Sequence, residues 1–219
     1  MATSKTSKTN PTPSSSGSSG STKKTGLIIG AVVLAVVAVF AISFLPGANE
    51  EVGAEWGEPV IEGHSLPQMP NDPQDTTATG IAYPKVTGEN FDGDTVVIEN
   101  DGKAKAIVFL AHWCPHCQVE VPRVNDWLNA GGDVKDVDFY SVSTSMNSAR
   151  PNYPPSDWLA PDNWQIPIIR DDKEGSVWSA YGAGGFPFWV FTNSDGTVAL
   201  RTSGELQISQ LEQIIASLN

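Results

Sequence analysis

The sequence predicts an α/β fold in which a central mixed sheet is flanked by helices. Short apolar runs typical of strands alternate with amphipathic stretches through the C-terminal two-thirds of the chain. The pattern closes with two strands joined by a turn, and then an amphipathic segment, Leu206–Leu218. Alternation of this kind indicates a sheet with helices on both faces, and the closing hairpin adds antiparallel strands.

The first half of this region is dominated by one fully apolar strand. We expect a hairpin over Phe91–Leu110, with a short strand at Thr95–Ile98 and a turn at Asn100–Gly102. The second strand of that hairpin, Ala106–Leu110, has the continuous apolar character of a buried central strand. The next stretch, Gln118–Leu128, carries apolar residues at helical spacing and predicts an amphipathic helix.

The second half predicts four further strands, a short helix and a terminal helix. The chain folds back at Asn193–Gly196, whose residues are typical of a hairpin turn. The elements expected around that turn are strands at Val137–Val142, Ile166–Ile169, Phe186–Phe191 and Thr197–Thr202, and helices at Gly175–Tyr181 and Leu206–Leu218.

The strongest chemical signal is the only pair of cysteines in the 219 residues, Cys114 and Cys117. They stand where the apolar strand ends and the predicted helix begins. Unpaired N–H groups and the positive end of the helix dipole stabilise a thiolate at that place. A stabilised thiolate has a lowered pKa and is a nucleophile at neutral pH. Cys117 follows one helical turn later, close enough to form a disulfide or to resolve a mixed one.

The neighbours of the cysteines fit the same chemistry. Pro115 suits the first turn of a helix, where its missing N–H is not needed. His116 can place an imidazole near the Cys114 sulfur and favour the thiolate. Trp113 is expected to shield one side of the site.

Two structural interpretations of the pair are weaker. A disulfide that closes a loop of two residues removes little chain entropy and would stabilise the fold little. A structural zinc site needs four ligands, and the chain has no second cysteine pair. A redox-active pair is therefore predicted, with no metal and no cofactor.

Composition divides the chain into four parts. Residues 1–26 are Ser, Thr, Pro, Gly and Lys with few apolar side chains, and predict a disordered tail. Residues 27–45 are a run of 19 uncharged, mainly apolar residues, long enough to cross a bilayer as a helix. Residues 46–80 are rich in Pro, Gly and acidic residues and predict a flexible linker, in which His64 and Met69 are expected to be solvated. Residues 81–219 remain for the folded domain.

Charge gives the expected orientation. The first 26 residues carry +4 of formal charge, which leaves −16 for the rest of a chain whose total is −12. The positive-inside rule then places the tail in the cytoplasm and the domain outside the cell membrane of a bacterium. A domain this acidic is not expected to bind nucleic acid. A cleaved signal peptide is the alternative to an anchor, with Val52–Ala54 as a cleavage site, but the apolar run exceeds the usual length.

Four motifs, in order, resemble the membrane-anchored thioredoxin-fold proteins of the TlpA/ResA type. They are a Gly-Lys turn and apolar strand before Trp113-Cys-x-x-Cys117; Glu120 and Pro122 after the second cysteine; Ile166-Pro-Ile-Ile-Arg-Asp171; and Tyr181-Gly182, Gly185-Phe186-Pro187-Phe188 and Asn193–Val198. The resemblance covers about residues 86–219. It implies a thioredoxin-like fold with an N-terminal hairpin extension and an insertion between Val142 and Pro187.

The resemblance also implies roles for single residues. Cys114 would be the attacking thiol and Cys117 the resolving thiol. Pro187 would be a cis-proline facing them, although the sequence alone favours the trans bond that most prolines adopt. The backbone of Phe186 would then be free to pair with a substrate peptide, beside Trp113.

The chain departs from this family at the site itself. Pro115-His116 matches the strongly oxidising DsbA family rather than the Gly-Pro of thioredoxin, and Phe186 is bulkier than the Thr or Val frequent in relatives. Position 108, where thioredoxins bury an aspartate, is Val108. Glu89 and Glu120 are the candidates to replace that proton acceptor.

These features predict a thiol–disulfide oxidoreductase that acts outside the cytoplasm. Cys-Pro-His-Cys favours disulfide formation in secreted or membrane proteins, because a stabilised thiolate stabilises the reduced form. The TlpA/ResA-like body favours the opposite direction, as in relatives that reduce apocytochrome c. In either case an integral-membrane partner is expected to recycle the pair. A copper-binding chaperone using His112, Cys114, His116 and Cys117 is the less favoured alternative, since the spacing and a downstream histidine are missing.

Overall fold

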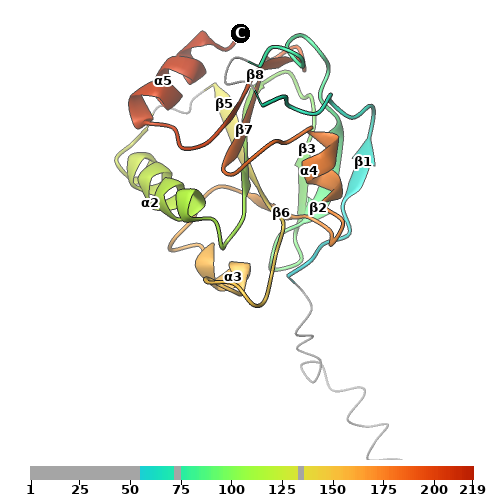
Figure 1. The fold of residues 1–219 in the computed structure, drawn as a ribbon. Helices are drawn as coiled ribbons and strands as arrows, with labels where there is room; N and C mark the ends of the chain where they lie inside the picture. Colours follow the sequence, from blue (N-terminus) through green and yellow to red (C-terminus); the bar gives the residue numbers. More distant parts are fainter. Residues whose placement is uncertain (1–54, 72–74, 133–135) are drawn as a thin grey trace, which may run out of the picture. The chain divides into compact units, whose positions relative to one another are not determined.

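The computed structural model describes residues 55–71, 75–132 and 136–219. They form two sheets and four helices, labelled as in Figure 1. The helices are α2 (Pro115–Asn129), α3 (Pro155–Trp158), α4 (Ser176–Ala180) and α5 (Ile208–Ser217). The predicted tail and the predicted membrane anchor, residues 1–26 and 27–45, lie outside the described residues. None of the helices in the described ranges is long and apolar enough to cross a bilayer.

The central sheet has five strands in the order β6-β5-β4-β7-β8. Strands β5 and β6 run parallel to β4, β7 pairs antiparallel with β4, and β8 pairs antiparallel with β7. This mixed α/β sheet is thioredoxin-like, so the predicted fold class is confirmed. Its strands are β4 (Ala104–Leu110), β5 (Val137–Ser143), β6 (Ile168–Arg170), β7 (Phe188–Thr192) and β8 (Val198–Ser203).

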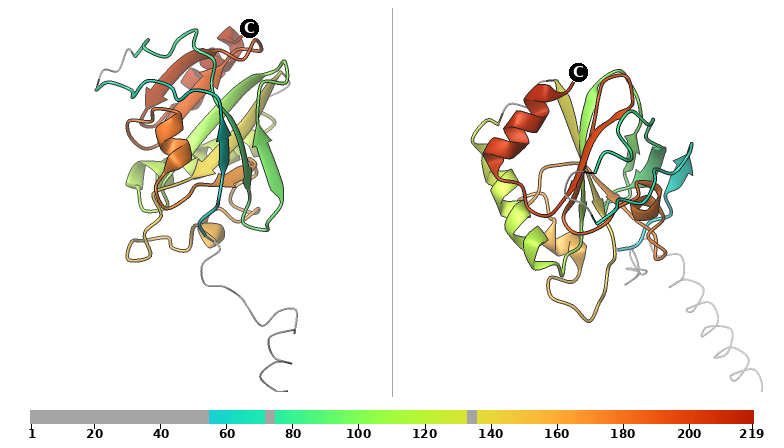
Figure 2. Two further views of the ribbon diagram at one scale, coloured as in Figure 1. Left: turned by 90° about the vertical axis from the view of Figure 1, so that its right-hand side faces the viewer. Right: turned by 45° about the horizontal axis from the view of Figure 1, so that its top comes forward.

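Strand β4 is buried along its whole length because both its edges and both its faces are covered. Alternate side chains such as Val108 and Leu110 join a core formed with α2 and α5. Ile107 and Phe109 point the other way, into a second core that includes residues of α4 and of the smaller sheet. Figures 1 and 2 show α2 and α5 on one side of the central sheet, with α4 and the smaller sheet on the other. The continuous apolar run thus reflects a strand between two cores.

The smaller sheet corrects the predicted hairpin over Phe91–Leu110. Strand β3 (Thr95–Ile98) pairs with β2 (Lys85–Glu89), and β2 pairs in turn with β1 (Val60–Glu62). Both edges of β4 are already occupied by β5 and β7, so β3 has no edge of β4 to join. The N-terminal extension is therefore a separate three-stranded antiparallel sheet.

The prediction of a flexible linker at residues 46–80 is wrong for the described residues of that range. Residues 55–71 and 75–80, here called the N-terminal arm, pack on the domain. Leu66 and Met69 are buried and donate backbone hydrogen bonds to the carbonyls of Ala180 and Gly182, at 2.8 and 2.7 Å. Met69 is thus a core residue, whereas His64 is exposed as expected. The folded unit begins before Ile81.

A buried ion pair fastens the arm. Arg201 of β8 donates from Nε and Nη2 to Oδ2 of Asp75, at 3.0 and 2.7 Å, and both side chains are enclosed. Nη1 of Arg201 also donates to the carbonyl of Pro67 at 2.7 Å. Buried charges are tolerated only when they are paired and hydrogen-bonded, so Arg201 requires the arm.

We predict that Asp75→Ala lowers the free energy of unfolding by about 3–5 kcal/mol, because it leaves the Arg201 guanidinium buried without a counter-charge. Urea unfolding of the full-length chain, followed by tryptophan fluorescence, measures the loss. The matched control is Glu62→Gln, which breaks an exposed pair with Lys85 and should cost less than about 1 kcal/mol. Equal losses in the two variants would show that the arm is not fastened in this way.

Candidate active site

The cysteine pair lies where β4 passes into α2. Cys114 is the N-cap of α2, with extended backbone angles (φ −77°, ψ 120°), and Pro115 opens the helix. The amide of Cys114 donates to Ala111 at 2.9 Å, and its carbonyl accepts the first helical bond, from Gln118, at 3.1 Å. Its side chain makes no capping hydrogen bond, so the sulfur is available for chemistry beside the helix N-terminus.

The two sulfurs differ in access. Cys114 keeps 6% of its surface exposed, whereas Cys117 is completely enclosed. Both are thiols in this structure. Burial, the largest cause, raises the pKa of Cys117 well above its ordinary value, and the nearby Glu120 raises it further. An exchange partner can reach Cys114 first, and Cys117 must lose a tightly held proton before it can act.

A second loop faces Cys114. The peptide bond between Phe186 and Pro187 is cis, as the resemblance implies. The carbonyl of Phe186 lies 3.8 Å from Sγ of Cys114, which donates to it. The loop before β7 is thereby brought against the reactive sulfur.

Aromatic side chains surround this point. The ring of Phe186 contacts Trp178 at 4.2 Å and Trp113 at 5.8 Å between centroids, and all three rings are half-buried. Nε1 of Trp113 donates to the carbonyl of Ser145 at 2.7 Å, and the guanidinium of Arg150 lies 5.1 Å above its ring. The site has an apolar rim that the sequence predicted at Trp113 and Phe186 but not at Trp178.

Glu120 is the buried acid beneath the cysteines. Its side chain is fully enclosed, and Oε1 accepts from Nε1 of Trp189 at 2.9 Å and from the amide of Leu206 at 3.1 Å. Oε2 accepts from Nη1 of Arg123 at 3.1 Å. Burial raises the pKa of Glu120 more than these hydrogen bonds lower it. Cys117 stands three residues earlier in α2, which places the two side chains on the same helical face.

The other candidate acid, Glu89, is excluded. Its carboxylate pairs with Arg170 at 2.7 Å and is 58% exposed, so it is no buried proton acceptor. Val108, the position of the thioredoxin aspartate, is enclosed in the same core cluster as both cysteines. Glu120 is therefore the remaining candidate for the role of that aspartate, and it comes from α2 instead of β4.

Comparison with known protein families shows the family to which this chain belongs. The model of the thioredoxin-like domain matches residues 91–219, which is more than half of the chain. This chain belongs to the thioredoxin-like family. The family and the reactive cysteine pair together identify it as a thiol–disulfide oxidoreductase.

Individual relatives are distant. Sporulation thiol-disulfide oxidoreductase A of Bacillus subtilis is 24% identical over 127 residues, which cover 57% of this chain and 74% of that protein. A secreted disulfide oxidoreductase of Mycobacterium tuberculosis superimposes with a TM-score of 0.50 at 21% identity, covering 60% of this chain and 95% of the other. A thioredoxin-family thiol:disulfide interchange protein of Chlorobium tepidum gives 0.51 at 18% identity, covering 67% and 97%. At these identities the superpositions support the fold alone.

Within this thioredoxin-like site, His116 contacts a residue that the sequence did not suggest. Its side chain is 66% exposed, and Nδ1 is hydrogen-bonded to Oε1 of Glu205 at 2.8 Å. Glu205 lies between β8 and α5, 89 residues away in sequence. A contact over that separation leaves no periodicity or spacing in the sequence, which explains why Glu205 was missed.

His112 has a structural role. It is almost fully buried; Nδ1 lies 2.6 Å from the carbonyl of Pro151, and Nε2 accepts from the amide of Asn147 at 3.0 Å. These bonds place the ring proton on Nδ1 and hold the loop between β5 and α3 beside the site. With both nitrogens engaged, His112 is not free to join a copper site. Among the described residues, no group of three or more His, Cys, Asp or Glu side chains is placed to hold a metal ion.

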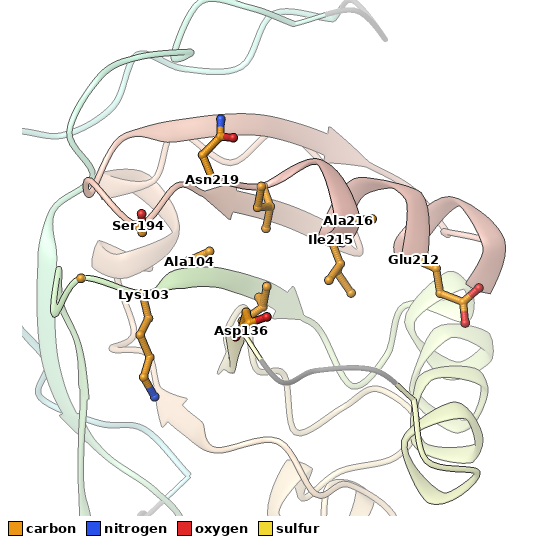
Figure 3. A pocket seen from close by; sticks show the side chains of 11 residues that line it. Lys103, Ala104, Asp136, Ser194, Glu212, Ile215, Ala216 and Asn219 are labelled. Carbon is orange, nitrogen blue, oxygen red and sulfur yellow. The ribbon is translucent and has the colours of Figure 1, made fainter.

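A cavity of about 620 Å³ lies elsewhere (Figure 3). It is lined from the start of β4 and from α5, by residues that include Lys103, Asp136 and Ile215. Because β4 begins there and ends at the cysteine loop, the cavity lies at the opposite end of the strand from the site. None of the predicted site residues lines it.

We predict that Glu120→Gln slows the reaction of Cys117 by about a hundredfold, the lower end of the range for general acid–base catalysis. Burial raises the pKa of Glu120, so the wild-type rate should rise with pH through a range above that of an ordinary glutamate. The Gln variant should lack that rise. Rapid-mixing measurements of mixed-disulfide resolution against pH give both results.

The matched control, Glu62→Gln, removes an exposed carboxylate from the smaller sheet and should leave the profile unchanged. A Glu120→Gln variant with the wild-type profile would exclude Glu120 as the proton acceptor.

Proposed function

We propose that this chain introduces disulfides into exported proteins through Cys114 and Cys117. The observation that carries the proposal is the pairing of an accessible cysteine at a helix N-terminus with an enclosed partner, inside a Cys-Pro-His-Cys motif. In general, a helix N-terminus stabilises a thiolate placed there, and a stabilised thiolate stabilises the reduced form of a cysteine pair. A pair whose reduced form is stabilised is an oxidant.

The steps of the oxidising reaction follow from the difference in access. A substrate thiolate attacks Sγ of Cys114, the Cys114–Cys117 bond breaks, and Cys117 leaves and takes up a proton. A second substrate thiolate then attacks the substrate sulfur of the mixed disulfide. The substrate gains a disulfide, Cys114 leaves as a thiolate, and two electrons have passed to the cysteine pair.

The loop before Pro187 is suited to hold the substrate. The Phe186 carbonyl lies beside Cys114, and an extended peptide can pair with backbone groups at this position. The half-buried rings of Trp113 and Phe186 offer apolar surface to the residues that flank a substrate cysteine. A site that binds substrate through backbone hydrogen bonds and an apolar rim would accept many different unfolded chains. An enzyme that acts on exported proteins requires this breadth.

Location is the second part of the proposal. The apolar run at residues 27–45, with lysines before it and acidic residues after it, supports a single-pass anchor and a domain outside the cytoplasm. A domain anchored in this way supports recycling of the cysteines by an integral-membrane redox partner.

Reduction of disulfides is the second candidate, and Glu120 favours it. A reductant must deprotonate Cys117 while the mixed disulfide is intact, and a buried carboxylate with a raised pKa, one helical turn away, can accept that proton. The same group can return the proton in the oxidising direction. Glu120 thus supports exchange in general, and the dipeptide Pro115-His116 decides our preference for the oxidant.

We predict that Cys114→Ser abolishes both insulin reduction and the oxidation of a reduced, unfolded protein. Cys117→Ser should instead accumulate a mixed disulfide with the substrate, visible by non-reducing electrophoresis, since the resolving thiol is missing. The two variants serve as each other's controls because each removes one sulfur from the same site. Exchange activity retained by Cys114→Ser would overturn the proposed function.

A further inference from the structure

A line of polar contacts joins the exposed face of the site to its buried acid. Nδ1 of His116 contacts Oε1 of Glu205 at 2.8 Å, and Oε2 of Glu205 accepts from Nη2 of Arg123, also at 2.8 Å. Nη1 of Arg123 donates to Oε2 of Glu120 at 3.1 Å. The line begins at the residue before Cys117 and ends at the residue one turn after it.

The ordinary interpretation of Glu205 is a surface salt bridge that holds α2 to the segment before α5. Such pairs contribute little, about 0–1 kcal/mol. Three features of the Glu205 contacts distinguish them from an ordinary surface salt bridge. Both oxygens of Glu205 are used, one by the His116 imidazole and one by the Arg123 guanidinium. Arg123 is shared with a fully buried carboxylate, and it also donates to the carbonyl of Leu206 at 3.0 Å. Glu205 is therefore part of the surroundings of Glu120.

The sharing of Arg123 determines how Glu120 behaves. Two carboxylates compete for one guanidinium, and Glu205 takes Nη2, which leaves only the single Nη1 contact for Glu120. The contacts from His116 and then Arg123 lower the pKa of Glu205, so it stays ionised where the enzyme works. The negative charge of Glu205 in turn raises the pKa of Glu120, in addition to the larger effect of burial, while Arg123 opposes both.

We infer that Glu205 is a positioning residue for thiol–disulfide exchange, which withholds Arg123 from full pairing with Glu120 and so keeps Glu120 able to take up and release a proton. This inference rests on the proposed function. In the proposed oxidising direction, a substrate thiolate attacks Sγ of Cys114, and the departing Cys117 takes up a proton from Glu120. In the reverse, resolving step, the proton of Cys117 passes to the Glu120 carboxylate, and the Cys117 thiolate attacks Sγ of Cys114. The bond from Cys114 to the substrate breaks, and the substrate sulfur leaves with the electron pair.

The groups that act on Glu120 can be named in full. From α2 they are Arg123 and the Cys117 thiol, and from the segment before α5 it is Glu205. Trp189 of β7 contributes an N–H donor that does not titrate. Glu205 faces His116 and Arg123. Of these, Glu205 is the group that can be neutralised without touching a reacting atom or the buried acid.

The test is the pH dependence of mixed-disulfide resolution in the full-length chain, with oxidised glutathione as the disulfide probe. Glu205→Gln should move the Glu120-dependent rise in rate to lower pH, by on the order of half a pH unit. In a Glu120→Gln background the same substitution should produce no shift, because the titrating group is gone. Glu205→Asp, which keeps the charge on a shorter side chain, should restore part of the wild-type profile.

The matched control is Glu62→Gln, which also removes a carboxylate bonded to a cation, Lys85, but on the smaller sheet. It should leave the profile in place. A Glu205→Gln profile that coincides with wild type, or a shift that persists without Glu120, would overturn the inference. If Glu205→Gln does not fold, Glu205→Ala is measured in its place, since it also removes the charge, and an unchanged profile in that variant overturns the inference. Failure of the wild-type chain to exchange disulfides at all would instead count against the proposed function.

Discussion

The site depends on one buried carboxylate, Glu120. An ionised group in a core costs several kcal/mol unless its partners are fixed, and here they come from three parts of the chain. Trp189 belongs to β7, Leu206 precedes α5, and Arg123 lies on α2 itself. By requiring all three, Glu120 fixes the first turns of α2 against the sheet. It thereby helps to set the positions of both cysteines, and its raised pKa suits the proton transfer that we propose for it.

The two faces of β4 belong to two different hydrophobic cores. One face belongs to the core that contains both cysteines and is covered by α2 and α5. The other is covered by α4 and the smaller sheet, and the N-terminal arm adds Leu66 and Met69 to that core. The arm therefore contributes to the rigidity of the scaffold from the side away from Glu120. Its ion pair between Asp75 and Arg201 is enclosed on that side.

The sequence predicts the features that depend on neighbouring residues, but not those that depend on contacts between distant parts of the chain. The strand–cysteine–helix unit follows from neighbouring residues, and the family resemblance added Pro187 and offered Glu120. The pairing of β3 with β2 could not be predicted, because it depends on both edges of β4 being occupied.

The arm looked like a linker because its Pro and Gly content is high. Its order comes from a few buried contacts and from Arg201, more than 120 residues away. The contact between His116 and Glu205 is likewise invisible in the sequence. Lys105 lies inside the apolar strand and is buried only because Asp101 and Asp138 reach its amine.

The reduction potential of the Cys114–Cys117 pair tests the central claim most directly. The full-length chain would be equilibrated with glutathione buffers and its thiols counted after trapping. Our account predicts a value near the oxidising end of the range, about −120 mV, because Pro115-His116 matches the dipeptide of the strongly oxidising DsbA family. A value near that of thioredoxin, about −270 mV or below, would contradict it and make the chain a reductant.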